Sequence, residues 1–412
     1  MRKIKSTSLL FLLFAIACNN NPGTNQNTMI KLNDTGFAKG TYGYDAAFIK
    51  KHATNVIELE NANSKILLSA DYQGRVFTST AKGDSGISFG WINYGLLSSA
   101  QKKKQFNPVG GEERFWLGPE GGQYSIFFKK DDPFDYAHWQ VPALIDTMAY
   151  KVDAFDKTSA TFSFTDSVIN YSGKTFHLDI TRIIRLLDEN AIEQRLNTTI
   201  PQSVHAVAFE SINQIKNIGN TAFNKDSGLL SIWLLGMFSP SEGAKVIIPF
   251  SPVKNARDFI TDDYFGKIDS SRLIINDSVL YFRCDGKSRG KIGLAPEIAK
   301  PFVCSYDFKK NVLTILIPEV HKNNRYVNSK WALQKKPYKG DVINSYNDGP
   351  LQDGSQMGPF YEIETSSPAQ ELKPGETQEY HQTTMHLQGD YETLKKLVQQ
   401  LIHVDLDDVK NW

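Results

Sequence analysis

The sequence has little cysteine, almost no net charge and no nucleotide-binding motif. Each of these features argues against one class of function. Its 412 residues include three cysteines, and no cysteine–histidine grouping has the spacing of a zinc site. The formal net charge is +1, so the chain lacks the basic footprint of a nucleic-acid partner. It also lacks a phosphate-binding glycine loop, a dinucleotide fingerprint and a nucleophile elbow, which argues against nucleotide chemistry.

The N-terminal segment has the pattern of an export signal. Basic residues at 2, 3 and 5 precede an apolar run from Leu9 to Ile16, which is too short to span a bilayer. The small residues that lead into Cys18 resemble a bacterial lipobox. This resemblance implies that Cys18 becomes the lipidated first residue of a mature lipoprotein. A plain secretory signal that is cleaved nearby is the alternative.

We therefore divide the chain into a signal peptide (1–18), a flexible polar tether (19–28) and one domain (29–412). We expect a lipid anchor through Cys18 to hold the protein on a bacterial membrane, facing the periplasm. Cys284 and Cys304 could form a disulfide in that oxidising compartment. It would close a loop of about 20 residues and add roughly 3 kcal/mol. Two buried free thiols are the alternative.

Short β-rich runs separated by Gly, Pro, Asn and Asp dominate the domain. Phe176, Leu178 and Ile180 alternate with polar residues, so one face of that strand is buried and the other is wet. We predict strands at 56–59 and 65–68, which form a hairpin, and at 75–79, 124–128, 176–181, 245–250, 279–283, 312–317 and 360–365. This pattern indicates an all-β fold, a large antiparallel β-sandwich.

Helices are few. Residues 45–52 fit a short helix before the first strand. Residues 390–403 carry an apolar stripe at helical spacing, made by Leu394, Leu397, Val398 and Leu401. We expect this C-terminal helix to dock against the sandwich.

The strand at 360–365 carries two carboxyl groups on one face. Successive strand residues point to opposite faces, so Glu362 and Glu364 share a face with Phe360, about 6.5–7 Å apart at the backbone. Burying two anions is costly. These side chains therefore either face water or form a site.

A second notable run, residues 110–122, has paired glycines at both ends. Between them lie Glu112, Glu113, Arg114, Trp116 and Glu120. Sugars bind by stacking a ring on an aromatic face and by hydrogen bonds from charged groups to hydroxyls. We expect a loop that supplies both kinds of group. An ordinary turn with a core tryptophan and a surface ion pair is the alternative.

Five further residues are candidates for ligand binding, each with a plainer alternative. Arg75 is a carboxylate-binding group or a surface charge, and Trp233 contacts ligand or packs in the core. Asn328 and Trp331 come from a mixed segment, and Asn347 belongs to an Asn-Asp pair that also suits a capped turn. We assign no cofactor, although Ca²⁺ would suit the oxygens of residues 347–348 and 112–113.

Three segments resemble the galactose mutarotase-like superfamily, the aldose 1-epimerases and their relatives. They are Gln73–Ser79, Ile363–Pro368 and Leu372–Glu376. Residues 110–122 and 344–350 are also similar to hallmarks of a family of uncharacterised Gram-negative lipoproteins in that superfamily. The resemblance implies a β-supersandwich, a carbohydrate ligand and an isomerase activity.

By the same resemblance Glu364 matches the general base of the epimerases, and Glu362 beside it would raise its pKa. The partner histidine of those enzymes would fall near 231–238, where Trp233 stands and no histidine is present. Glu113, Glu120 or a histidine from elsewhere in the chain would then supply the acid. Three hypotheses follow: an epimerase-like enzyme, a carbohydrate-binding lipoprotein that uses the same cleft, and a structural lipoprotein with an empty cleft.

Overall fold

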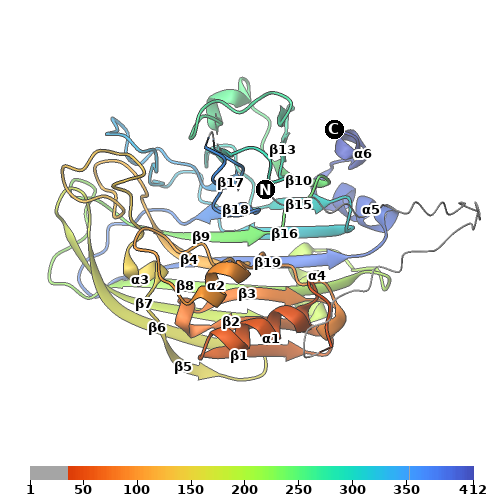
Figure 1. Ribbon diagram of the computed structural model, residues 1–412. Helices are drawn as coiled ribbons and strands as arrows, with labels where there is room; N and C mark the ends of the chain where they lie inside the picture. The colour runs from red at the N-terminus through yellow and green to blue at the C-terminus, as the bar shows by residue number, and fades with distance from the viewer. Residues whose placement is uncertain (1–35, 352) are drawn as a thin grey trace, which may run out of the picture. The chain divides into compact units, whose positions relative to one another are not determined.

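Strands dominate the computed structural model, which describes residues 36–351 and 353–412. They form three sheets in which all neighbours are antiparallel (Figure 1). The all-β prediction is therefore confirmed. The signal peptide, Cys18 and the tether lie outside the described residues.

The largest sheet has ten strands. In spatial order they are β12 (Leu273–Ile275), β13 (Val279–Arg283), β10 (Ala244–Pro249), β15 (Val303–Asp307), β16 (Val312–Pro318), β19 (Thr377–Gln388), β8 (His205–Asn217), β7 (Thr175–Leu186), β6 (Ser159–Ile169) and β5 (Lys151–Phe155).

A six-stranded sheet packs against it. Its order is β11 (Ile260–Thr261), β14 (Gly290–Leu294), β17 (Ile343–Asn347), β18 (Tyr361–Ser366), β9 (Ser231–Phe238) and β4 (Arg114–Gly118). Apolar side chains of both sheets share one core, for example Phe115 and Leu234 with Ile180 and Phe209. This is the arrangement of a β-sandwich.

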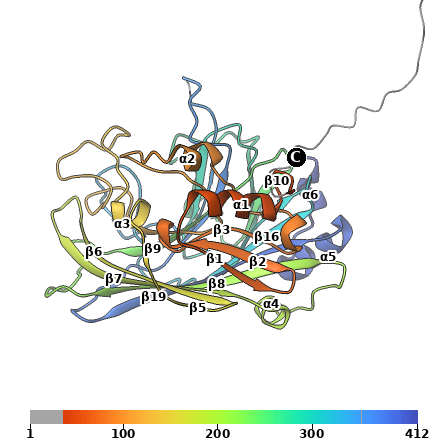
Figure 2. The same cartoon turned by 60° about the horizontal axis from the view of Figure 1, so that its bottom comes forward.

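The third sheet contains the predicted hairpin. It consists of β1 (Val56–Asn61), β2 (Ser64–Ser69) and β3 (Arg75–Thr80). Helix α1 (Tyr42–His52) lies over it and buries Tyr42, Ala46 and Ile49 against Leu67 and Phe77 (Figure 2). The remaining short elements are η1 (Ala70–Tyr72), η2 (Gly83–Ser85), α2 (Tyr94–Ser99), α3 (Ala143–Asp146), η3 (Ala256–Phe259) and α6 (Asp407–Lys410).

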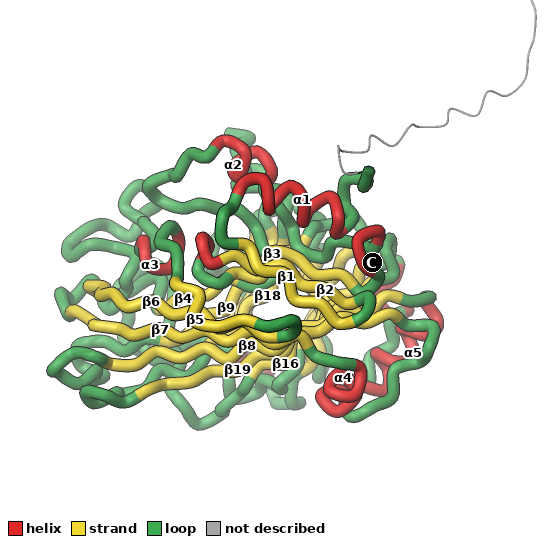
Figure 3. Tube along the Cα trace, turned by 90° about the horizontal axis from the view of Figure 1, so that it is seen from below, coloured by secondary structure: helices red, strands yellow, loops and turns green. Residues whose placement is uncertain are grey.

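Two helices cover the outer face of the ten-stranded sheet at one end (Figure 3). They are α4 (Glu189–Leu196) and α5 (Tyr391–Ile402). Helix α5 confirms the predicted C-terminal helix, and the Asp390 carboxylate accepts a hydrogen bond of 3.0 Å from the Thr393 amide as its N-cap. None of the described helices is long and apolar enough to cross a membrane.

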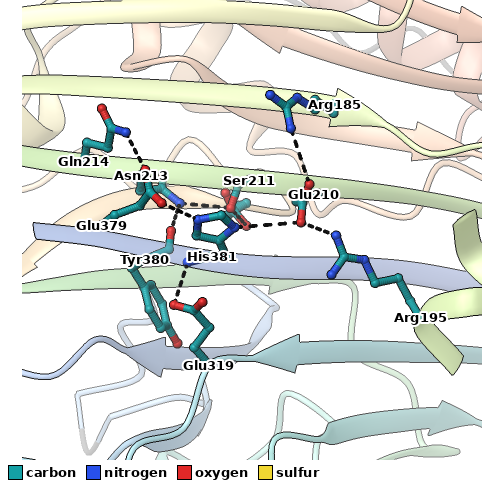
Figure 4. Close-up of polar contacts among 11 residues, drawn as sticks. Arg185, Arg195, Glu210, Ser211, Asn213, Gln214, Glu319, Glu379, Tyr380 and His381 are labelled. Carbon is teal, nitrogen blue, oxygen red and sulfur yellow. Dashed lines mark hydrogen bonds and ion pairs between the residues drawn. The ribbon is translucent and has the colours of Figure 1, made fainter.

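A charged cluster on this outer face ties α4 to the strands (Figure 4). Glu210 of β8 accepts a hydrogen bond of 2.5 Å from Arg195 of α4 and lies 3.9 Å from Arg185 of β7. On β19, His381 contacts Glu379 at 2.7 Å. Glu210 is buried, but Arg185, Arg195, His381 and Glu379 are partly exposed, so solvent screens each pair and it adds little free energy.

Two sequence predictions about backbone structure are wrong. Residues 124–128 form turns rather than a strand, because their amides bond locally: Ser125 donates to the Gly122 carbonyl and Phe127 to the Ser125 hydroxyl. The run 110–122 is not a continuous loop, because strand β4 occupies its centre and pairs with β9.

Cys284 and Cys304 are buried free thiols. Cys304 lies in β15, and Cys284 follows β13 two strands away in the ten-stranded sheet. Burial raises the pKa of both thiols, so they stay protonated and inert.

An ion pair lies in the core between the two large sheets. The Arg182 guanidinium of β7 donates to Glu113 Oε1 at 2.7 Å, and both side chains are fully buried. Ser211 and Gln382 donate to Glu113 Oε2 at 3.0 and 2.9 Å. Every carboxylate oxygen of Glu113 is thus bonded.

We predict that Arg182→Met lowers the free energy of unfolding by about 3–5 kcal/mol, because it leaves Glu113 buried without its counter-charge. Adding Glu113→Gln should recover part of this loss. Arg185→Met on the outer face of the same strand is the matched control and should cost less than about 1 kcal/mol. Urea unfolding measures the free energy of unfolding of wild type, the two single variants and the double variant. Equal losses of this free energy in Arg182→Met and Arg185→Met would contradict the account.

Candidate functional site

The outer face of the six-stranded sheet, turned away from the ten-stranded sheet, carries the site. Strand register places Arg114 of β4, Leu235 of β9 and Glu364 of β18 in one row across the sheet. Glu362, Tyr346 of β17 and Lys291 of β14 form a second row. Alternation puts both rows on the same face.

A small pocket of about 70 Å³, partly open to solvent, lies over this face. Charged residues in its lining are Arg114, Glu120, Arg289, Lys291 and Glu362. Aromatic residues in its lining are Phe106, Trp116, Tyr136, Trp139, Trp233, Phe265, Trp331, Tyr346 and Phe360.

Two buried ion pairs organise the floor of the pocket. Arg114 donates to Glu362 Oε1, and the Lys291 ammonium donates to Glu364 Oε2 at 2.8 Å. The Trp233 indole donates to the same Glu364 oxygen at 3.0 Å. The prediction that Glu362 and Glu364 share a face is confirmed, and both carboxyl groups are buried in ion pairs rather than exposed to water.

Glu364 lies beneath the pocket rather than in its wall. Its side chain is 0 % exposed, and Lys291 and Trp233, which hold it, line the pocket above. Its second oxygen, Oε1, has no hydrogen-bond partner among the described residues. The carboxyl groups that line the pocket are Glu120 and Glu362.

Aromatic rings hold the cations in place. The Arg114 guanidinium lies 4.6 Å from the ring centre of Trp116, and the Lys291 ammonium lies 4.9 Å from that of Trp233. Trp116 and Trp233 themselves meet edge to face at 5.4 Å. At the rim, half-buried Trp331 stacks on Trp139 at 5.8 Å.

Several buried donors of the pocket lack a partner among the described residues. They are Arg114 Nε and Nη1, Arg289 Nε, Trp116 Nε1 and Trp139 Nε1. Buried polar groups are normally hydrogen-bonded, and an unmade bond costs free energy. These donors therefore suit a polar ligand in the pocket.

Burial raises the pKa of two pocket carboxyls. The pKa of Glu120 rises to about 7, with Glu364 adding to the rise and Lys291 opposing it. The pKa of Glu362 also rises to about 7, although Arg114 opposes the shift. Both groups therefore change charge near neutral pH, where acid–base catalysts work best.

The structure brings some of the predicted site residues into the pocket and places others elsewhere. Arg114, Trp116, Glu120, Trp233, Trp331 and Glu362 line it, and Glu364 lies beneath it. Trp233 is therefore more than a core residue, because its indole contacts both the pocket and Glu364.

Arg75, Glu112 and Glu113 do not line this pocket. Glu113, which immediately precedes β4, points to the face opposite Arg114, where Arg182 binds it. Glu112 accepts hydrogen bonds from Ser79 and His386 in the core. Arg75 donates to the Gly110 carbonyl at 2.8 Å, and burial lowers its pKa to about 9. All three have bonds that hold the fold together.

Asn328 and Asn347 also lie outside the pocket. Asn347 accepts from the Gly286 amide at 3.0 Å and donates to the Ser288 carbonyl at 2.8 Å, which fixes the turn that carries Arg289. Asn328 accepts from the Lys330 amide at 3.0 Å, close to Trp331. Each asparagine thus supports a segment that reaches the pocket.

No group of three or more His, Cys, Asp or Glu side chains within 36–351 and 353–412 is arranged to hold a metal ion. The carboxylate oxygens of Glu112 and Glu113, considered above for Ca²⁺, bond instead to protein donors.

Sequence reasoning missed Lys291, Arg289 and Trp139. Lys291 precedes the buried Ile292 in β14, so alternation alone puts it on the face opposite that residue. No short-range sequence pattern predicts that β14 lies two strands from β18. That placement depends on strand pairing between distant segments.

The raised pKa of Glu120 predicts a pH-dependent stability. Its ordinary value is near 4.5, so between about 4.5 and about 7 the folded state holds the proton that the unfolded state releases. The free energy of unfolding therefore falls as pH rises through this window.

In Glu120→Gln this fall should be smaller. Between pH 4.5 and pH 8, the free energy of unfolding of the variant should rise relative to that of wild type by on the order of 1–3 kcal/mol. Exposed Glu297→Gln serves as the matched control and should run parallel to wild type. Urea unfolding at pH 4.5 and pH 8 measures the free energy of unfolding of each protein. If Glu120→Gln and wild type change by the same amount between the two pH values, the raised pKa of Glu120 is contradicted.

Solved structures of low sequence identity resemble the chain. A Synechocystis protein has a TM-score of 0.49 at 10 % identity, with 81 % of this chain and 96 % of that one covered. A protein of Escherichia coli K12, provisionally assigned as an aldose 1-epimerase, gives 0.48 at 9 % identity, with 82 % and 99 % covered. A galactose mutarotase-like protein of Lactobacillus casei gives 0.46 at 10 %, with 81 % and 100 % covered.

These values are too low to carry an argument about activity. No curated protein matches the sequence significantly. A family model does match residues 40–412, and its description is a family of unknown function, DUF6786. The match spans most of the sequence, so the chain belongs to this family.

Proposed function

We propose that the pocket over the six-stranded sheet binds a carbohydrate. The observation that carries the proposal is the combination of an aromatic wall with buried donors that lack partners. The apolar face of a sugar ring stacks on aromatic rings, and its oxygens accept hydrogen bonds. Rings with a polar edge, such as tryptophan, serve both needs at once.

The position of the aromatic residues supports this choice of ligand. Trp331 and Tyr136 lie at the rim, while Trp116 and Trp233 lie deeper and hold the cations. A ligand that enters between them meets ring faces first and charged donors last. A purely apolar ligand would leave Nε and Nη1 of Arg114 without hydrogen-bond partners.

A second candidate function is proton transfer on the bound sugar. It is favoured by Glu120, which lines the pocket and has a pKa of about 7. Glu120 would donate a proton to the ring oxygen, and Glu364 would take one from the anomeric hydroxyl. Because Lys291 and Trp233 cover Glu364, this role requires the Lys291 side chain to move from its present position.

Lipid anchoring through Cys18 and a place on the periplasmic side of a membrane remain part of the proposal. They rest on the basic and apolar pattern of residues 1–18, which lie outside the described residues.

For the binding function, we predict that Trp331→Ala weakens sugar binding at least about tenfold, roughly 1.4 kcal/mol, because the rim loses a stacking face. Trp412→Ala is the matched control, since Trp412 lies against Arg283 outside the pocket. Isothermal titration with neutral and acidic mono- and disaccharides makes the comparison. Saturable binding that Trp331→Ala leaves unchanged would contradict the location, and a panel without any binding would contradict the function.

For the catalytic function, we predict that wild type speeds the interconversion of the anomers of a bound sugar. Glu364→Gln and Glu120→Gln should each lower this rate at least about a hundredfold. Polarimetry measures the rate. Sugar binding by wild type without any faster interconversion would leave a binding protein and reject the enzyme.

A further inference from the structure

Arg289 is the pocket cation that makes no ion pair among the described residues. Arg114 is paired with Glu362, and Lys291 with Glu364. The Arg289 guanidinium lies 4.0 Å from the ring centre of Phe265. Its Nε is buried without a hydrogen-bond partner.

The charge balance of the pocket follows from these pairs. Two of the three cations are neutralised by their own carboxylates, and the remaining carboxyl of the lining is Glu120. Burial raises the pKa of Glu120 to about 7, so this group carries only part of a negative charge at neutral pH. Arg289 is half-buried, and the two acidic groups that act on it electrostatically, Glu120 and Asp348, form no ion pair with it. Its guanidinium is therefore available to an anionic group of a ligand.

Unpaired hydrogen-bond donors also outnumber unpaired acceptors among the fully buried atoms of the pocket. Among the fully buried atoms in and beneath the pocket, those without partners among the described residues are five donor nitrogens of Arg114, Arg289, Trp116 and Trp139, against one acceptor, Glu364 Oε1. A hydroxyl group that accepts a hydrogen bond has its own proton to donate, whereas an anionic oxygen only accepts. The excess of donors thus favours anionic oxygens over neutral hydroxyls alone.

We propose that the ligand is a saccharide that carries an anionic group, and that Arg289 receives this group while the aromatic wall holds the ring. A guanidinium binds carboxylate or phosphate through two parallel hydrogen bonds. The anion is thus a carboxylate, a phosphate or a sulfate on the sugar. This inference rests on the proposed carbohydrate-binding function.

The asparagine below the turn supports the role of Arg289. Asn347 bonds to the backbone of Gly286 and Ser288, which directly precede Arg289. Gly290, the next residue, already belongs to β14 and pairs with Asn347. The base of the Arg289 side chain is therefore fixed against the sheet, which lowers the entropic cost of binding an anion.

The test compares matched sugars by isothermal titration at pH 7. D-Glucose, D-glucuronate, D-glucose 6-phosphate and D-glucose 6-sulfate form one series, and D-galactose and D-galacturonate form another. We expect at least one anionic sugar to bind ten times more tightly than its neutral parent. The member that does so identifies the anion.

Arg289→Gln should abolish this preference, so that the anionic sugar and its neutral parent bind this variant with affinities within threefold of each other. Arg289→Lys, which keeps the charge but loses the paired donors, should retain part of the preference. Arg185→Gln is the control on the outer face of the ten-stranded sheet and should bind like wild type.

Three results would overturn the inference. If neutral parents bind as tightly as the anionic sugars, the charged-ligand inference fails while carbohydrate binding stands. If acetate, phosphate or sulfate alone binds as tightly as the anionic sugar, the site is a simple anion site. If no saccharide binds, the inference and the proposed function fail together. Should Arg289→Gln not fold, the wild-type preference and Arg289→Lys decide.

Discussion

The opposite orientation of Glu113 and Arg114 is the constraint on which the rest of the site depends. Glu113 immediately precedes strand β4 and pairs with Val76, Arg114 is the first residue of the strand, and the two side chains point to opposite faces of the six-stranded sheet. Glu113 meets Arg182 between the sheets, and Arg114 meets Glu362 beneath the pocket. Since a buried charge is stable only with a partner, each face needs its own matched set of charges.

The two sets differ in how completely their atoms are bonded. Between the sheets, both oxygens of Glu113 have protein donors, and this network joins the residue that precedes β4 to β7, β8 and β19. Beneath the pocket, Arg114 and Glu364 each keep polar atoms without partners among the described residues. The first network is complete in itself and holds the sandwich together. The second is incomplete, and this difference is why the outer face is the one to which we assign a ligand.

Much of the fold follows from patterns within short segments. The alternation at 176–181, the hairpin at 56–68 and the apolar stripe of 390–403 each predict the element that the structure contains. Within the site, the shared face of Glu362 and Glu364 follows from the same alternation. Glycines at 110–111 and 121–122 suggested a loop, but β4 begins at Arg114, and this error placed Glu112 and Glu113 with the ligand. Lys291 and Arg289 depend on the pairing of β14 with β17, which no local pattern reveals.

The most direct test of the account is a crystal structure of the protein soaked with the saccharide that binds most tightly in solution. The account predicts density in the pocket over the six-stranded sheet, with the ring against the tryptophans and its anionic group on Arg289. A saccharide bound at another surface, or one whose anionic group points away from Arg289 into solvent, would contradict it.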